Sequence, residues 1–207
     1  MQLNNLMPST FSARLRMQIY AKDLDVTINN IPWPPTDEYR QRTGTGKVPS
    51  LEVDGMTLIE STAIGEFFED LGKGPSLRPT APLERARMRM LIQISDHYIA
   101  PNLVPFIMAI VRGNHDPAVL AAARPKLMDA LKLLEERIGG GAYAIGGSLS
   151  LADCALVPPL LYVTIFLPML GIAEPLRDFP RTARYFAAIQ KHPAAAKIIG
   201  EMTAPAH

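Results

Sequence analysis

The segment Lys47–Leu71 contains residue types that suit the binding of a small peptide. Val48 precedes Pro49, and a residue before proline is held in extended geometry, so its N–H and C=O can pair with an extended ligand as an added strand would. Glu60 and Ser61 stand where a helix is predicted to begin. The positive end of that helix and the Ser61 hydroxyl suit a carboxylate, whereas Glu60 suits an ammonium group. A ligand with a peptide middle and an amino-acid-like end would match all four residues.

The pattern of apolar and turn-forming residues predicts a hairpin and a helix around these residues. Short apolar strands are predicted over Ser50–Val53 and Met56–Ile59, joined by Asp54-Gly55, a strong two-residue hairpin signal. A helix follows, ended by Gly72, with an apolar face of Ile64, Phe67, Phe68 and Leu71. A hairpin followed by a helix can have a purely structural role. The complete order of Val-Pro, strand, Asp-Gly, strand, Glu-Ser and helix is more specific for a binding site than any one of these signals.

The first part of the chain predicts an α/β unit. A strand is expected over 2–6, a helix over 12–22, a second strand over 25–31 and a short helix near 36–42 within the proline-rich loop 32–46. With the hairpin and helix that follow, the order is βαβ then ββα. This order is that of a thioredoxin-like domain, which we place at 1–74 with a crossover helix between parallel strands.

The rest of the chain predicts helices alone. The segment 72–82 carries two glycines and three prolines, and we place a linker at 75–82. An all-helical domain is expected over 83–207, with helices near 83–99, 102–112, 118–138, 181–191 and 194–200.

A capping-box pattern precedes the most apolar segment. Ser150 is followed three residues later by Asp153, which assigns both residues a structural role at a helix start. The segment Ala155–Ala173 has no charge and is long enough to span a membrane. Because it contains three prolines, we interpret it as a buried core helix ending near Pro168.

The charge and the cysteine and histidine content of the chain limit which partners and metals it is expected to bind. The net charge of +1 offers no bulk field for nucleic acid or an anionic membrane, so neither is expected as a partner. One cysteine excludes an internal disulfide, and the scattered histidines give no metal-ligand spacing, so no metal is expected. The first residues do not resemble a signal peptide, and a cytoplasmic location is expected.

The order of motifs in 47–61, together with the S-x-x-D box, resembles the cytosolic glutathione transferases, and the resemblance covers essentially the whole chain. It implies glutathione as co-substrate and a cis peptide bond at Pro49. It also implies that Val48 pairs with the cysteinyl part of glutathione, and that Glu60 and Ser61 hold its γ-glutamyl end.

The resemblance implies a serine-type catalytic group near the first helix. The sequence Ser9-Thr10-Phe11-Ser12-Ala13-Arg14-Leu15 matches the motif S-[ST]-x-x-x-R-[VL] of the serine-type classes. On this match Ser9 is the catalytic hydroxyl, with Thr10 and Ser12 as alternates. Each can instead cap the helix, and we assign that role to Ser12. A free thiol has a pKa of about 8.5, so the task of the hydroxyl is to stabilise the thiolate. Arg14 and Arg16 are expected to be solvated or structural.

Further residues are assigned by the same resemblance. Lys47 is a candidate for the glycyl carboxylate of glutathione, although an exposed lysine explains it equally well. Asp96 is a candidate for the γ-glutamyl ammonium across a homodimer, and a solvated helix acid is the alternative. The pocket for the second substrate is expected to be apolar, with the candidates Phe11, Tyr98, Phe106 and Tyr162.

The pattern around Ser9 and around 150–158 is closest to the zeta class, which includes maleylacetoacetate and maleylpyruvate isomerases. After Pro158-Pro159, however, the chain continues Leu-Leu-Tyr-Val-Thr-Ile-Phe, without the polar Asn and Arg associated with those isomerases. We therefore predict a transferase acting on a hydrophobic, aromatic electrophile in detoxification. The alternatives are a zeta-like isomerase, a glutathione-dependent lyase or dehalogenase, and a non-catalytic binding protein of the same fold.

Overall fold

A computed structural model describes residues 1–113 and 116–204. The chain forms two compact units: the N-terminal unit, residues 1–77 with 193–204, and the helical unit, residues 78–192. An all-helical domain was expected over residues 83–207. The last helix, α9 (Pro193–Thr203), belongs instead with the N-terminal unit, because it packs along α1 (Thr10–Lys22).

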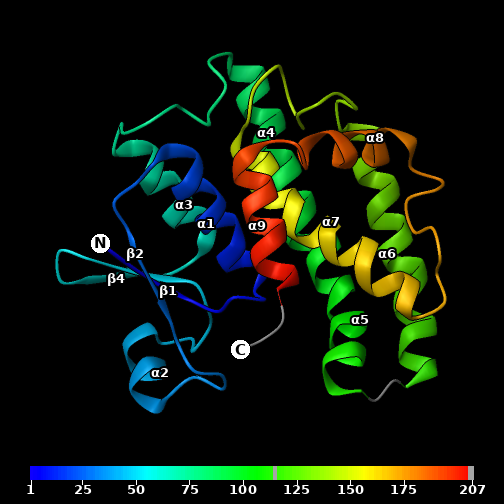
Figure 1. The fold of residues 1–207 in the computed structure, drawn as a ribbon, viewed down its shortest axis with the longest axis horizontal. Helices are drawn as coiled ribbons and strands as arrows, with labels where there is room; N and C mark the ends of the chain where they lie inside the picture. Colours follow the sequence, from blue (N-terminus) through cyan, green and yellow to red (C-terminus); the bar gives the residue numbers. More distant parts are fainter. Residues whose placement is uncertain (114–115, 205–207) are drawn as a thin grey trace. The chain divides into compact units, whose positions relative to one another are not determined.

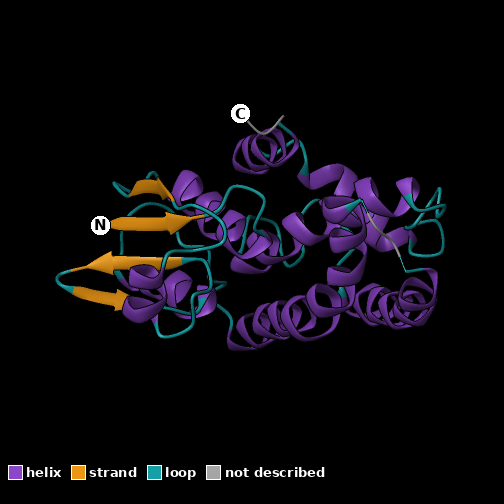
Figure 2. Ribbon diagram, turned by 90° about the horizontal axis from the view of Figure 1, so that it is seen from below, coloured by secondary structure: helices purple, strands orange, loops and turns teal. Residues whose placement is uncertain are grey.

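The N-terminal unit is built on a four-stranded sheet. β1 (Gln2–Asn5), β2 (Thr27–Asn30), β3 (Ser50–Val53) and β4 (Met56–Leu58) stand in the order β2-β1-β3-β4. β1 and β2 are parallel and joined by α1, whereas β3 is antiparallel to β1 and β4 (Figure 2). Helices α1 and α3 (Ser61–Asp70) cover one face of the sheet, and α2 (Asp37–Thr43) lies on the other (Figure 1). The thioredoxin-like prediction is confirmed.

The hairpin between β3 and β4 has the predicted turn. Asp54 has φ 48° and Gly55 has φ 78°, and the strand residues that flank them, Val53 and Met56, pair directly. Positive φ at both central positions defines the turn whose twist matches that of the strands.

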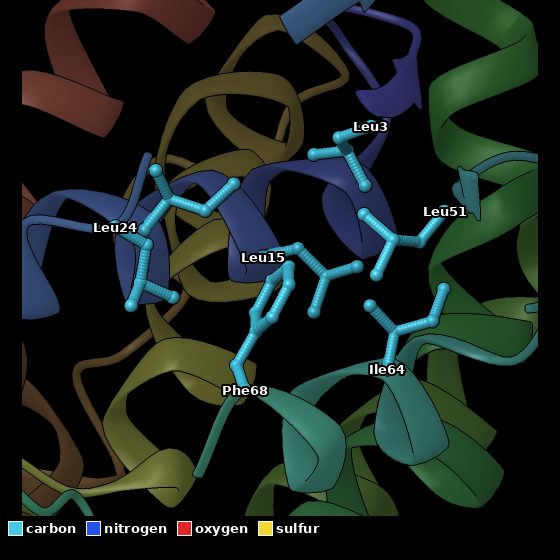
Figure 3. Close-up of a cluster of buried hydrophobic side chains, with 7 residues drawn as sticks. Leu3, Leu15, Leu24, Leu51, Ile64 and Phe68 are labelled. Atoms are coloured by element: carbon cyan, nitrogen blue, oxygen red, sulfur yellow. The ribbon is translucent and has the colours of Figure 1, made fainter. Parts of the chain in front are cut away.

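A hydrophobic core lies against one face of the sheet (Figure 3). It contains side chains from β1, α1, β3 and α3 and one residue just after α1, each at most 7% exposed: Leu3, Leu15, Ile19, Leu24, Leu51, Ile64 and Phe68. This packing fixes α1 and α3 against the sheet, and so fixes where their first residues lie.

Helix α1 begins earlier than predicted. Its N-cap is Ser9, whose Oγ accepts a hydrogen bond from the backbone N–H of Ser12 at 3.2 Å. The assignment of the cap to Ser12 was therefore wrong. Ser12 is fully buried in the first turn, with its Oγ 3.4 Å from the Leu6 backbone N–H. The two additional residues, Thr10 and Phe11, join the helix because Ser9 satisfies an N–H group that would otherwise lack a partner.

The segment after α3 is anchored to the N-terminal unit. Lys22 and Glu69 form a buried ion pair at 2.9 Å, and the Lys22 ammonium donates to the carbonyl of Pro75 at 2.8 Å. Glu69 also accepts from the backbone N–H of Leu77 at 3.0 Å. Residues 75–77, predicted as the start of a linker, are thereby bonded to α1 and α3.

The helical unit begins with α4 (Pro82–Ile94), which continues through a π-helical turn, Ser95–Ile99, into α5 (Ala100–Arg112). The sequence predicted two separate helices here, near 83–99 and 102–112, on either side of Pro101. In the turn, the N–H of Ala100 reaches the carbonyl of Ser95, five residues back. Such a turn accommodates a proline, which supplies no N–H of its own, without ending the helix.

The other helices of this unit are α6 (Pro117–Arg137), α7 (Leu151–Met169) and α8 (Pro180–Ile189). The capping box at the start of α7 is confirmed, with Asp153 accepting from the backbone N–H groups of Ala144 and Ser150, both at 2.8 Å. The segments 82–112 and 151–169 are long and apolar enough to cross a membrane by length and composition. However, the apolar window of α7 is 78% buried inside the protein, as a core helix is.

Candidate functional site

Ser9 lies in a short loop whose geometry is set by several hydrogen bonds. Residues 6–9, which we term the Ser9 loop, connect β1 to α1. The backbone N–H of Ser9 donates to the carbonyl of Leu6 at 3.0 Å, which closes a turn. The guanidinium of Arg16 donates to the carbonyl of Met7 at 3.0 Å. Since a hydroxyl both accepts and donates, a Ser9 Oγ that accepts from Ser12 still has its proton available for an acceptor beside it.

The other two hydroxyl candidates differ in access. Ser12 is fully buried, whereas Thr10 is half-buried, as Ser9 is. A hydroxyl without accessible surface cannot meet a ligand atom unless the helix moves. The structure therefore leaves Ser9 and Thr10 as the groups with access at the start of α1.

The Val48–Pro49 peptide bond is cis, as the resemblance implied, and so is Trp33–Pro34. Tyr39 of α2 supports this segment from behind. Its hydroxyl donates to the carbonyl of Lys47 at 2.9 Å and lies 3.1 Å from the Oγ of Ser50, and burial raises the pKa of this phenol. Sequence reasoning missed Tyr39, because its only local signal is the apolar side of a seven-residue helix.

Glu60 and Ser61 open α3 as predicted. Glu60 is exposed at the N-cap position with φ 68°, a left-handed conformation that is uncommon outside glycine. Ser61 is 7% exposed, and its Oγ accepts from the guanidinium of Arg14 at 3.4 Å. Arg14 also lies over the ring of Phe11, 5.1 Å from its centroid.

These groups share one end of the sheet. Asn4, the third residue of β1, pairs with Ser50, the first of β3, so the carboxyl end of β1 and the amino end of β3 meet there. The Ser9 loop leaves the sheet at this end and Pro49 enters it. Arg14 then connects α1 to Ser61 at the start of α3. A hydroxyl, an extended backbone segment and a helix N-terminus are thus neighbours in the N-terminal unit.

The arginines of the motif are buried, so of the two roles expected for them, solvated or structural, the structure supports the structural one. Arg14 is 6% exposed and Arg16 is fully buried. Arg16 donates to Glu201 of α9 at 3.0 Å and to Asn5 Oδ1 at 2.6 Å, in addition to Met7. A buried charge is tolerated because it is paired and hydrogen-bonded.

The remaining candidates are placed as follows. Lys47 is exposed beside Val48, and Asp96 is half-exposed in the π-helical turn. Tyr98 is 50% exposed, whereas Phe106 and Tyr162 are 2% and 4% exposed and pack within the helical unit. Phe106 and Tyr162 could therefore contact an electrophile only after neighbouring side chains move.

The segment after Pro158-Pro159 brings no charge to the helical unit. Tyr162 stacks on Phe166 with ring centroids 4.6 Å apart. Of this segment, Thr164 lines a surface hollow of about 590 Å³, which is formed mainly by residues 173–183. Among the described residues, no group of three or more His, Cys, Asp or Glu side chains is placed to hold a metal.

A thioredoxin-like unit that presents a hydroxyl beside a cis-proline segment, combined with an all-helical unit, defines the class of glutathione transferase folds. Residues 8–71 match the model of the glutathione S-transferase N-terminal domain, and residues 117–188 match that of the C-terminal domain. The chain belongs to the glutathione S-transferase family.

Its relatives include proteins named as isomerases. Maleylacetoacetate isomerase of Pseudomonas aeruginosa is 31% identical over 205 residues, which are 94% of this chain and 93% of the relative. Probable maleylacetoacetate isomerase 1 of Drosophila melanogaster is 31% identical over 160 residues, and the match covers 73% of this chain and 64% of that relative's length. The chain therefore spans less than two thirds of the Drosophila protein.

Solved structures share the fold. Glutathione transferase F7 from Populus trichocarpa has a TM-score of 0.82 at 24% identity, covering 98% of this chain and 99% of that one. A maleylacetoacetate isomerase from Methylobacterium extorquens AM1, solved with bound malonate and GSH, has a TM-score of 0.83 at 24% identity over the full length of both chains.

Proposed function

We propose that this protein binds glutathione in the N-terminal unit and ionises its thiol beside Ser9 for attack on a hydrophobic, aromatic electrophile. The observation that carries the proposal is the hydrogen bond from the Ser12 N–H to the Ser9 Oγ. It orients the hydroxyl so that its proton is free to donate, and a donor to sulfur favours the thiolate. The positive end of α1 adds to this effect.

In the proposed binding mode, Val48 pairs with the cysteinyl backbone, and Glu60 and Ser61 hold the γ-glutamyl ammonium and carboxylate. Lys47 approaches the glycyl carboxylate. The aromatic candidates for contact with the electrophile are Phe11 and Tyr98, which have exposed surface, and Phe106 and Tyr162, which would need neighbouring side chains to move. The charge-free segment after Pro158-Pro159 supports an apolar electrophile, because a dicarboxylate would need cations there.

The test is turnover of an activated aryl halide with glutathione by Ser9→Ala. We expect kcat/KM to fall about 10- to 100-fold, which corresponds to about 1.4–3 kcal/mol. Ser9→Ala also removes the helix cap, which contributes about 1 kcal/mol to stability, so thermal unfolding is measured in parallel. Ser9→Thr keeps both cap and hydroxyl and should retain most activity. Full activity of Ser9→Ala, or loss of activity in Thr10→Val instead, would remove Ser9 from its role.

A second candidate function is cis–trans isomerisation of a dianionic substrate of the maleylacetoacetate type. The similarity to isomerases over 94% of the chain favours it. Parallel assays of the isomerisation and the aryl conjugation decide between them, and we expect conjugation to be faster. Thioether or halide cleavage by glutathione is a further form of the same chemistry. A protein that binds glutathione but turns over none of these substrates would be a non-catalytic member.

We further propose a cytoplasmic homodimer in which Asp96 reaches the glutathione of the partner. Sedimentation equilibrium tests the dimer. If it forms, Asp96→Asn should weaken glutathione binding without changing the oligomeric state.

A further inference from the structure

Arg16 connects the start of the chain to α9, which is 185 positions away in sequence. Its guanidinium donates to Met7 in the Ser9 loop at 3.0 Å, to Asn5 at the end of β1 at 2.6 Å, and to Glu201 of α9 at 3.0 Å. The Arg16 side chain is fully buried, and the Glu201 side chain is 21% exposed. The carbonyl of Met7 is two residues from Ser9, so the position of this guanidinium sets the path of the Ser9 loop.

Glu201 is itself held in place. Its second oxygen accepts from the hydroxyl of Tyr20 at 2.7 Å. The ammonium of Lys197, one turn earlier on α9, lies 3.6 Å from the centre of the Tyr20 ring. Of the three acceptors of Arg16 named above, Glu201 is the charged one, and a charged partner makes the strongest of such hydrogen bonds. α9 therefore determines the direction in which the Arg16 fork points.

We propose that Glu201 is a positioning residue that acts through Arg16 to hold the Ser9 loop, so that α9 is part of the machinery that ionises glutathione. The inference rests on the proposed role of Ser9. Without the carboxylate, the guanidinium turns toward other acceptors, and the Met7 carbonyl moves with it. The Ser9 hydroxyl then donates less directly to the sulfur, while the groups that bind the rest of glutathione stay in place.

The experiment compares Glu201→Gln with Glu69→Gln in the full-length protein. Both changes neutralise the acid of a buried ion pair that involves an arginine or lysine of α1, but Glu69 pairs with Lys22 at the far end of that helix. The first readout is the pKa of the bound glutathione thiol, followed by the ultraviolet absorbance of the thiolate against pH. The second is the affinity for S-methylglutathione, which has no thiol. The third is thermal unfolding.

We expect Glu201→Gln to raise the thiol pKa by about one unit, which is a tenfold smaller ionisation constant. The affinity for S-methylglutathione should not change. Glu69→Gln should lower the unfolding temperature without moving the thiol pKa. An unchanged thiol pKa in Glu201→Gln, or an equal rise in Glu69→Gln, would overturn the proposal, because the effect would then be absent or due to general loosening.

If Glu201→Gln does not fold, Tyr20→Phe tests the proposal instead. This change removes the hydrogen bond from the Tyr20 hydroxyl to Glu201 and keeps the ion pair between Glu201 and Arg16. A smaller rise in the thiol pKa supports the proposal and no rise overturns it. Ser9→Ala separates this inference from the proposed function. If Ser9→Ala leaves the thiol pKa unchanged, the proposed function fails. If Ser9→Ala raises the thiol pKa and Glu201→Gln does not, the proposed function stands and only the role of Glu201 fails.

Discussion

At the scale of single residues, Glu60 of the candidate site has an unusual backbone conformation. Its φ of 68° at the start of α3 lies in the left-handed region, and its side chain is exposed. Non-glycine residues in this region cost of order 1–3 kcal/mol and are retained where the surroundings impose them. Glu60 thus stands where the ammonium group of a γ-glutamyl ligand is proposed to bind.

Glu60→Gln should weaken glutathione binding about tenfold, because a hydrogen bond to a charged group contributes about 1.5–3 kcal/mol and the amide retains part of it. Titration calorimetry with glutathione measures the change. Asp54→Asn is the matched control, since it also removes one exposed negative charge from this unit. Asn tolerates the positive φ of the hairpin turn, so the fold should not change. Equal weakening in both variants would argue for a general electrostatic effect.

At the scale of elements, helix ends are satisfied by distant residues. The N-terminus of α8 receives its cap from Glu135 of α6. This carboxylate accepts from the backbone N–H groups of Arg181 and Thr182 at 2.9 and 2.8 Å, and from the Thr182 hydroxyl at 2.8 Å. Burial by itself would raise the pKa of Glu135, but these hydrogen bonds outweigh it and hold the pKa below its usual value.

Glu135→Ala should lower the free energy of unfolding by about 1–2 kcal/mol, the contribution of a helix cap. Glu136→Ala, at the adjacent position with a surface ion pair to Arg137, should change it by less than about 0.5 kcal/mol. Urea unfolding at neutral pH measures both. Equal losses would exclude a capping role for Glu135.

The same carboxylate predicts a pH dependence. Because the folded-state pKa of Glu135 is lowered, its contribution is complete above the unfolded value of about 4.3 and is lost as pH falls through the folded value. The stability difference between the wild-type protein and Glu135→Gln should therefore shrink as pH is lowered from 7 to below about 4. A constant difference over this range would contradict the assignment.

At the scale of the whole molecule, the chain leaves α3 along a path with no space for side chains at one point. Gly74 has φ 66°, and a Cβ there would lie 2.3 Å from the backbone oxygen of Lys22. Gly72 has nearly the same conformation, φ 64°, but a Cβ there would meet nothing within 4 Å. The close approach at Gly74 allows Lys22 to reach the carbonyl of Pro75.

Gly74→Ala should therefore destabilise the protein more than Gly72→Ala. Each substitution lowers stability by about 1 kcal/mol because alanine is strained at positive φ. Only Gly74→Ala also forces the backbone of this segment away from that of α1. Unfolding temperatures of the two variants measure the difference. Equal unfolding temperatures of the two variants would show that the segment at Gly74 can move away from α1 without loss of stability.

The sequence by itself determined the features that depend on neighbouring residues. Asp54-Gly55 specified its turn because both residues tolerate positive φ, and Ser150 with Asp153 specified a reciprocal cap three residues apart. The order of strands and helices, and the resemblance built on Val48, Pro49, Glu60 and Ser61, led to the correct fold and family. These signals depend on residues that are close together in the sequence, so the sequence alone is enough to predict them.

Tertiary structure decided what depends on contacts between distant residues. Arg16 and Glu201 are 185 positions apart, so no local pattern could show that the arginine is buried or that α9 packs against α1. Ser9 rather than Ser12 became the cap because the bonds around the Ser9 loop start the helix earlier. The π-helical turn carried the chain past Pro101, and Glu135 capped a helix 46 residues away. In each case the deciding energy comes from burial and hydrogen bonding that exist only once the chain has folded.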